Sequence, residues 1–220
     1  MRVWLMGGCI LTASGKRAMP RAPGGRGPPF VVEWKHMEQR RVEGFIYLLG
    51  FGVSIPLSNW MIGHVGVVCP SNGPCLLPVG PGILAPSGVL IVGIALVLRD
   101  LVQRRLGKSW TLLAITVGAL LSAVLAPPPL VVASGCAFAV SELADFAVYT
   151  PLQRRGLVLA VLASSLVGLV VDSFLFLQLA FGGLEFLMGQ VLGKTWMVLL
   201  SLPLIAWLRR RDERLGIEPA

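Results

Sequence analysis

The sequence is poor in charge, in histidine and in cysteine, and each shortage argues against a class of protein. Only 14% of its 220 residues are charged and 55% are hydrophobic, whereas a soluble domain carries about 25% charged residues. A soluble globular enzyme, a disordered chain and a coiled coil therefore fit poorly. Four cysteines are too few for a disulfide scaffold, and no paired CxxC pattern for zinc occurs. With a mean hydropathy of +0.78, the composition indicates a membrane protein.

Motifs of ATPases and of intramembrane enzymes are also missing. The sequence contains no Walker motif, no HExxH zinc motif and no GxGD signature of intramembrane aspartyl proteases. Its two histidines, His36 and His64, fall outside the centre of the predicted membrane region. Because a hydrolase needs a nucleophile and a base, or a metal, we expect no enzymatic activity, no metal site and no cofactor.

Six apolar segments are long enough to cross a bilayer, whose hydrocarbon core of about 30 Å requires about 20 helical residues. The second segment is apolar only as far as Leu98. We predict an all-α integral membrane protein with six transmembrane helices, at Gly44–Gly63, Ser87–Leu106, Trp110–Ala126, Leu130–Tyr149, Gly156–Phe181 and Glu185–Leu208.

Basic residues alternate between the connections of these predicted helices. From the segment before the first helix to the tail, the connections and their margins contain 8, 0, 4, 0, 2, 0 and 4 Lys or Arg residues, and only Lys194 falls outside the pattern. This is the positive-inside pattern of an even number of helices with both termini in the cytoplasm. We therefore expect a multi-pass protein of the bacterial cytoplasmic (inner) membrane, whose net charge of +8 reports its orientation and not a nucleic-acid partner.

The first 36 residues differ from the rest of the chain. The apolar part of Met1–Cys9 is too short for a signal peptide, and Pro20–Pro29, rich in Pro, Gly and Arg, cannot bury enough surface to fold. We expect residues 1–36 to be disordered or to precede the true start of translation at Met37. Residues 37–214 are then the membrane domain and residues 215–220 a short tail.

The connection Gly63–Pro86 is unusually rich in glycine and proline. It is too apolar for a free loop and too broken for a helix, which suggests a re-entrant or lid segment. Cys69 and Cys75 lie on the predicted outer side, where they either form a local disulfide or remain free thiols. One histidine, His64, beside two cysteines is a weak signal for a metal site, so we interpret it as a histidine at a helix end.

Charged side chains within a membrane segment cost at least about 2.5–3.5 kcal/mol each, which makes each one a candidate for function. Asp172 and Lys194 both fall roughly 13 Å below the outer surface, on adjacent antiparallel helices. This matching depth predicts an ion pair between them. The pair serves either a substrate or only the stability of the helix bundle.

Four further charged residues lie deeper. Glu142 and Asp145, three residues apart, share one face of the fourth helix, and Arg99 and Asp100 reach a similar depth on the second. We predict that Arg99 pairs with Glu142 or Asp145. Together with the outer pair, two bases face four acids, so two acids are either protonated or available to a ligand.

Small and polar residues accompany these charges. Gly189 and Gly193 form a GxxxG pattern that we expect to bring the sixth helix, with Gln190 and Lys194, close to the fifth. On the first helix, small residues are interpreted as helix packing or as a docking face for a partner, and not as part of a substrate site; they are Gly50, Ser54 and Ser58.

Several motifs in this order resemble the vitamin uptake transporter (VUT) family, also called queuosine precursor transporters. The resemblance covers roughly Glu43–Arg210, and the spacing of Asp100, Asp145, Asp172 and Lys194 is its most specific part. It is carried by Asn59-Trp60, Arg99-Asp100-Leu101-Val102-Gln103-Arg104, Ser141-Glu142-Leu143-Ala144-Asp145, Ser165-Leu166-Val167-Gly168 before Asp172, and Gln190 with Lys194.

This resemblance implies a six-helix bundle, like the substrate-binding S-components of vitamin importers, that imports 7-deazaguanine precursors of queuosine such as preQ0 or preQ1. A carboxylate accepts bidentately from the adjacent N–H donors of a guanine-like base, and an amide complements a neighbouring acceptor. The candidate substrate-binding residues are therefore Asn59, Trp60, Asp100, Glu142, Asp145, Asp172, Gln190 and Lys194, with Trp60 or Phe138 stacking on the ring.

The expected partners are a small molecule and the lipid bilayer. The alternative within transport is an S-component that requires a separate ATPase module, and a homo-oligomer is also open.

Overall fold

Six helices and one β-hairpin make up the computed structural model, which describes residues 29–71, 73–126 and 128–217. The helices are α1 (Pro29–His64), α2 (Val89–Leu106), α3 (Lys108–Leu125), α4 (Val131–Leu152), α5 (Leu157–Phe181) and α6 (Leu187–Leu215). The hairpin consists of β1 (Leu76–Gly80) and β2 (Ile83–Pro86), and a 3₁₀ turn (Pro128–Leu130) precedes α4. The expectation of disorder for residues 1–36 falls largely outside the described residues, and α1 already begins at Pro29.

Five of the helices are long and apolar enough to cross a membrane: Glu38–His64 within α1, and α3, α4, α5 and α6. The segment Ser87–Leu106, predicted as the second of six spans, does contain helix α2. It is not among the five, because its 18 residues include four charged ones, Arg99, Asp100, Arg104 and Arg105. The helical architecture of the prediction is therefore confirmed, and five of its six spans qualify by length and composition.

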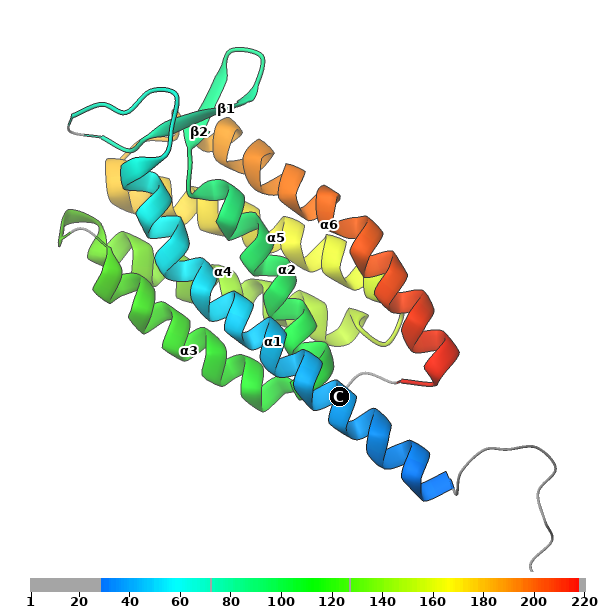
Figure 1. Cartoon of the computed structure of the whole chain (residues 1–220). Coiled ribbons are helices and arrows are strands. Elements are labelled where there is room, and N and C mark those ends of the chain that lie inside the picture. The colour runs from blue at the N-terminus through cyan, green and yellow to red at the C-terminus, as the bar shows by residue number, and fades with distance from the viewer. Residues whose placement is uncertain (1–28, 72, 127, 218–220) are drawn as a thin grey trace, which may run out of the picture.

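The neighbours of α2 explain how it carries these charges. It is packed against each of the other five helices, and most of its residues are buried, including all four charged ones. Figure 1 shows α2 behind α1 in the middle of the bundle. The charged half of α2 therefore meets protein and not lipid.

The larger of two buried apolar clusters lies among α2, α4, α5 and α6. Around it the helices turn large hydrophobic side chains outward, such as Val124, which is 79% exposed, and Leu49, which is 68% exposed. Outward apolar faces on a helical bundle are what a lipid environment requires. The core residues are Leu96, Val97, Leu101, Tyr149, Leu157, Ala160, Val161, Leu169, Val198, Ile205 and Leu208.

Two tight connections depend on glycine. Gly107, with φ of 88°, is the single residue between α2 and α3, and Gly182, with φ of 66°, ends α5 in the left-handed conformation. The N–H of Gly182 donates to the carbonyl of Gln178, which satisfies one of the acceptors at the helix end. These short turns make α2 and α3 antiparallel neighbours, and likewise α5 and α6.

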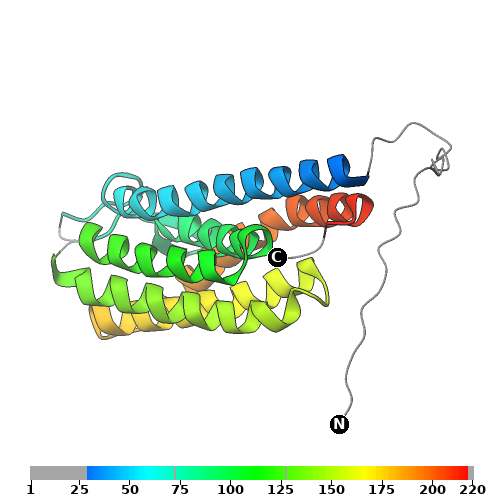
Figure 2. The ribbon, with the colours of Figure 1, turned by 90° about the horizontal axis from the view of Figure 1, so that it is seen from below.

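The β-hairpin covers one end of the bundle, above the start of α6 (Figure 1). The Nε1 of Trp196 on α6 donates to the carbonyl of Val79 at 3.1 Å. A Cβ on Gly189 would lie 2.2 Å from the Leu84 carbonyl oxygen, so only glycine allows the hairpin to sit this close. Figure 2 shows α1 running the length of the bundle beside the end of α6.

Candidate functional site

A cavity lies beneath the hairpin, between the halves of the six helices that are nearer to the hairpin. Its wall is mostly apolar, with polar side chains from every helix except α2. It is lined by Ser54, Ile55, Ser58, Asn59, Ile62, Pro86, Gly88, Val89, Val92, Ala95, Leu96, Ser122, Ser134, Phe138, Ser141, Glu142, Asp172, Phe176, Gln190 and Lys194. An apolar pocket with a few convergent polar groups is typical of a small-molecule site.

Lys194 on α6 forms one polar corner of this cavity. Its ammonium Nζ lies 2.5 Å from Oδ2 of Asp172, 2.8 Å from Oγ of Ser173 and 2.9 Å from Oε1 of Gln190. These contacts use all three of its donors. Lys194 is 1% exposed and the Asp172 side chain 16%, so the ion pair expected from matching depth is present and nearly dry.

Arg99 on α2 is the centre of a second charged cluster, directly below the cavity. Its guanidinium contacts three carboxylates: Nη1 lies 2.9 Å from Asp100, Nε lies 3.0 Å from Glu142 and Nη2 lies 2.5 Å from Asp145. None of these four side chains is more than 4% exposed. The planar guanidinium, with its fixed fork of donors, is suited to contacting three carboxylates at once, whereas an ammonium is not.

Glu142 connects this Arg99 cluster to the cavity. Its Oε2 accepts from Nε of Arg99, while its side chain also lines the cavity wall. Among the hydrogen bonds of the described residues, its Oε1 takes part in none. Glu142 is therefore the acid of this cluster that a ligand in the cavity can reach.

The structure divides the eight predicted substrate-binding residues into three groups. Asn59, Glu142, Asp172, Gln190 and Lys194 line the cavity. Two others do not line it but lie beneath it in the Arg99 cluster; they are Asp100 and Asp145.

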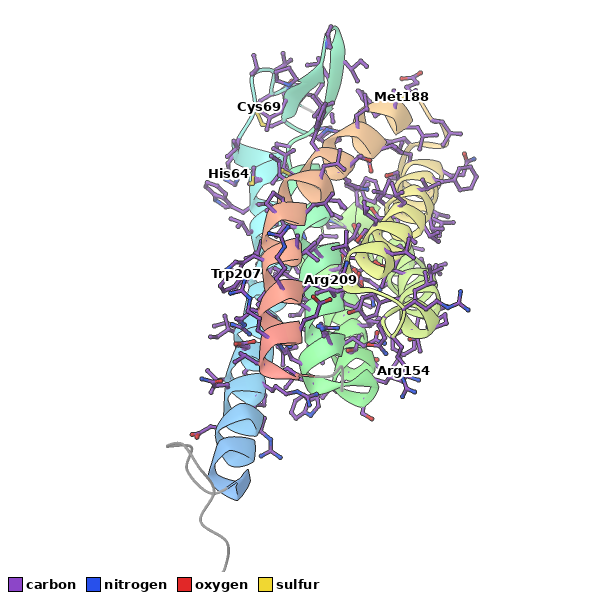
Figure 3. All side chains as sticks on the ribbon, turned by 90° about the vertical axis from the view of Figure 1, so that its right-hand side faces the viewer. His64, Cys69, Arg154, Met188, Trp207 and Arg209 are labelled. Carbon is purple, nitrogen blue, oxygen red and sulfur yellow. A yellow bond between two sulfur atoms is a disulfide. The ribbon has the colours of Figure 1, made fainter. Side chains whose placement is uncertain are left out.

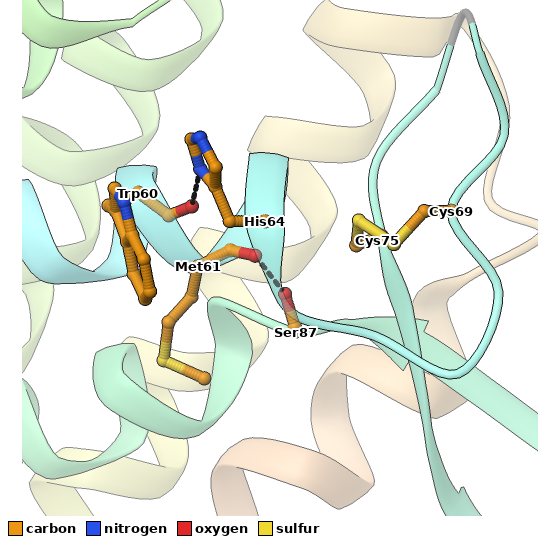
Figure 4. Close-up of a disulfide and its surroundings, with 6 residues drawn as sticks. All are labelled: Trp60, Met61, His64, Cys69, Cys75 and Ser87. Carbon is orange, nitrogen blue, oxygen red and sulfur yellow. Dashed lines mark hydrogen bonds between the residues drawn. A yellow bond between two sulfur atoms is a disulfide. The ribbon is translucent and has the colours of Figure 1, made fainter.

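Trp60 is the exception, and its expected stacking on a ligand is not supported by its position. Its side chain is 53% exposed, and its ring stacks on His64 with centroids 5.1 Å apart and planes at 9°. Figure 4 shows the two rings together at the end of α1, with Nδ1 of His64 donating to the Trp60 carbonyl at 2.8 Å. The aromatic rings in the cavity wall are instead Phe138, which the sequence suggested, and Phe176, which it did not.

Serine residues of the cavity wall were missed or misinterpreted from the sequence. Ser54 and Ser58 on α1, predicted as packing residues or a docking face, line the cavity together with Asn59. Their hydroxyls donate to Phe51 and Ile55 carbonyls within the same helix, which leaves hydroxyl lone pairs for a ligand. The signal was present in the sequence, because Ser54, Ser58 and Asn59 recur at helical spacing.

The GxxxG pattern of α6 packs differently from the prediction. A Cβ on Gly193 would lie 2.7 Å from Cγ2 of Val89 on α2, and one on Gly189 would meet the hairpin at Leu84. The two glycines therefore seat the hairpin and α2 against α6, and not α5. Lys194 reaches Asp172 of α5 by the length of its own side chain.

Cys69 and Cys75 are joined by a disulfide, with their Cα atoms 4.0 Å apart. Cys75 is buried at 3% exposure, and its N–H donates to the Ile62 carbonyl at 2.8 Å while its carbonyl accepts from Ser87. Both sulfurs are consumed by this bond (Figure 4), so they do not join His64 in a metal site. The disulfide ties the chain between α1 and the hairpin to the end of the bundle.

A further cluster of charges lies at the opposite end of the bundle from the hairpin. Figure 3 shows His64, Cys69 and Met188 near the hairpin end and Arg154 toward the other. There Asp212 of α6, 1% exposed, accepts from Arg104 at 2.9 Å and from both Nη1 and Nη2 of Arg105. Two of the basic residues, Arg104 and Arg105, thus have a structural role, because they join α2 to α6.

Comparison with known proteins supports the resemblance over part of the chain. Residues 122–208 match the family model described as "Putative vitamin uptake transporter". No curated protein and no solved structure matches the chain. The five apolar helices support a multi-pass membrane protein, and residues 122–208 are similar to this family of transporters.

The resemblance to the vitamin uptake transporter family is thereby confirmed over residues 122–208. This range contains Glu142, Asp145, Asp172, Gln190 and Lys194. Asn59, Arg99 and Asp100 lie before it, on α1 and α2.

Proposed function

We propose that this protein imports a 7-deazaguanine precursor of queuosine, such as 7-cyano- or 7-aminomethyl-7-deazaguanine, across the bacterial cytoplasmic membrane. The observation that carries the proposal is the cavity below the hairpin, where a carboxylate, two amides and two aromatic rings converge. They are Glu142, Asn59, Gln190, Phe138 and Phe176. The hairpin lies on the outer side if the positive-inside pattern holds, so the ligand enters from outside.

The groups in the cavity match the edges of such a ring. A guanine-like edge offers adjacent N–H donors, and Oε1 of Glu142 is an acceptor without a partner among the described hydrogen bonds. The Nδ2 of Asn59 donates to the Ile55 carbonyl at 3.0 Å, which leaves its Oδ1 and second N–H for the ligand. The ring faces pack against Phe138 or Phe176.

The variant Glu142→Gln tests this assignment, and Glu213→Gln is its matched control. Glu213 pairs with Arg209 at a surface where it is 60% exposed, away from the cavity. Hydrogen bonds to charged groups contribute about 1.5–3 kcal/mol, so we expect Glu142→Gln to weaken ligand binding by about 10- to 150-fold. The control should bind as the unaltered protein does.

Two measurements check the proposal. The first is the thermal shift of the purified protein with 7-cyano- and 7-aminomethyl-7-deazaguanine, compared with biotin and other vitamins. The second is uptake of labelled 7-deazaguanine by precursor-starved cells expressing each variant. Equal stabilisation by unrelated vitamins would contradict the substrate, and unchanged uptake with Glu142→Gln would contradict the site.

An S-component that needs an ATPase module is the second candidate, because a cavity with an apolar wall and a few polar groups suits both modes of transport. Ser54 and Ser58, once candidates for a docking face, line the cavity instead. Copurification of an ATPase with the protein from native membranes, and uptake that depends on that ATPase, would favour this candidate.

A further inference from the structure

The Arg99 cluster contains more acid than base. One guanidinium contacts the carboxylates of Asp100, Glu142 and Asp145, in a site where exposure does not exceed 4%. The neighbouring bases within the described residues are already paired, Lys194 with Asp172 and Arg104 with Asp212. If all three acids were ionised, the cluster would carry a charge of −2 without contact with bulk water, a state that burial strongly disfavours.

Asp100 and Asp145 are the acids that most need a proton. Their carboxylates both contact the guanidinium of Arg99, at 2.9 and 2.5 Å, so two buried acids share one cation. An ionised carboxylate is only an acceptor, and a proton on one of the two makes it a donor. Ser164 on α5 gives its hydroxyl hydrogen to Oδ2 of Asp100 at 2.7 Å.

Asp145 provides a second, independent indication. Its side chain is 0% exposed, and its Oδ2 has no hydrogen-bond partner among the described residues. The backbone of α5 closes over this oxygen, because a Cβ on Gly168 would lie only 3.1 Å from it. A proton shared between Asp145 and Asp100 would give this buried oxygen the partner that it lacks.

The same cluster is connected to the cavity through Glu142. This residue lines the cavity and also accepts from Nε of Arg99. A ligand that binds Glu142 therefore competes with Arg99 for this carboxylate. When the contact between Glu142 and Arg99 weakens, the guanidinium interacts more strongly with Asp100 and Asp145. Ligand and proton are in this way coupled through one arginine.

We propose that the Asp100–Asp145 pair binds one exchangeable proton and that this proton is transported with the ligand. The inference rests on the proposed import function and adds its energy source. On the outward-open side a carboxylate oxygen takes a proton from hydronium, which leaves as water, and on the inward-open side the carboxylic acid returns the proton to water, so one O–H bond breaks for each one that forms. The charged and titratable groups around the pair are Arg99 and Arg104 on α2, Glu142 and Tyr149 on α4, and the Asp172–Lys194 pair of α5 and α6.

Proteoliposomes supplied from outside with labelled 7-cyano-7-deazaguanine test the coupling. This probe is neutral, so any dependence on a pH gradient comes from the protein and not from a charged ligand. For one proton per ligand, an inward proton gradient should raise the accumulation ratio by about tenfold per pH unit. Counterflow is the exchange of labelled for unlabelled ligand without a proton gradient. It reports binding and translocation of the ligand independently of their coupling to protons.

The variant Asp145→Asn should retain counterflow and lose the response to the gradient, while Glu213→Gln should behave as the unaltered protein. Counterflow by the unaltered protein with accumulation indifferent to the gradient would overturn the proton site and leave the import function intact. An Asp145→Asn variant that still responds to the gradient would also overturn it. If the unaltered protein shows no counterflow, the import function itself is wrong and the coupling falls with it.

An infrared measurement on the unaltered protein keeps the proposal falsifiable if Asp145→Asn does not fold. At neutral pH we expect the carbonyl-stretch band of a protonated carboxylic acid. The band should shift when the protein is labelled with ¹³C-carboxyl aspartate and should not shift with labelled glutamate. The absence of this band, or a shift with glutamate alone, would contradict a proton on Asp100 or Asp145.

Discussion

Replacing Lys194 by methionine would remove a buried charge and keep much of the side-chain volume. Asp172 would lose its cation, and Ser173 and Gln190 would lose the ammonium that they now contact at 2.8 and 2.9 Å. Because Lys194 is 1% exposed, solvent does not replace these contacts. Breaking a buried ion pair from one side costs about 3–5 kcal/mol, which we expect as the loss in free energy of unfolding.

The matched control is Arg209→Met, the same kind of change on the same helix. Arg209 also pairs with an acid, Glu213 at 2.7 Å, but the two side chains are 51% and 60% exposed. Exposed pairs at this spacing contribute only about 0.3–0.5 kcal/mol. The two variants therefore separate the effect of burial from that of removing a positive charge from α6.

The double variant Lys194→Met/Asp172→Leu tests the reason for the loss. It removes the stranded carboxylate as well, so it should regain most of the stability lost in the single variant. Denaturant and thermal unfolding in detergent are measured for these three variants, for the single variant Asp172→Leu and for the unaltered protein. A loss in Lys194→Met no larger than in Arg209→Met, or a double variant as unstable as the sum of its single variants, would refute the reasoning.

Three further predictions concern the hairpin and the opposite end of the bundle. Gly189→Ala should lower the free energy of unfolding by about 1–3 kcal/mol and weaken ligand-induced thermal shifts, because its Cβ would lie 2.2 Å from a backbone oxygen of the hairpin. The control Gly52→Ala, whose Cβ would have nothing within 4 Å, should leave both unchanged. Asp212→Ala should cost about 3–5 kcal/mol because two buried arginines lose their carboxylate, and a loss below about 1 kcal/mol in denaturant unfolding would contradict this account. Reduction of the disulfide between Cys69 and Cys75, which are six positions apart in the sequence, should lower the free energy of unfolding by about 2 kcal/mol. An unaltered melting temperature with reductant would show that the disulfide does not constrain the chain.

Most of the helices and two of the charged contacts could be predicted from the sequence. Apolar length located each helix, and helical rise placed Asp172 level with Lys194 and Arg99 level with Glu142. These predictions succeeded because depth along a helix follows directly from counting residues. The direction of each side chain around the helix does not, since it depends on how the helices pack.

The errors have that common cause. Trp60 has the right depth for the cavity but turns outward to His64, while Ser58, two residues away in the same helix, turns inward. Gly189 and Gly193 were recognised as a close-contact pattern, but the partner was not, because a GxxxG pattern does not specify what approaches it. The β-hairpin was also not predicted, because the glycines and prolines of this segment indicated a re-entrant or lid segment without specifying its strands.

The central place of α2 has a consequence for how the protein enters a membrane. Four charged residues in its 18-residue length make α2 a poor candidate for insertion on its own, since each costs about 2.5–3.5 kcal/mol at the middle of a helix. Most of the partners of its acids and bases lie on α4, α5 and α6, which are synthesised later, although Arg105 also pairs with Glu43 of α1. Before those helices arrive, α2 has to be sheltered by α1, by α3 or by the insertion machinery. The charges that serve the finished bundle thus delay its assembly, and the last helix, α6, completes it.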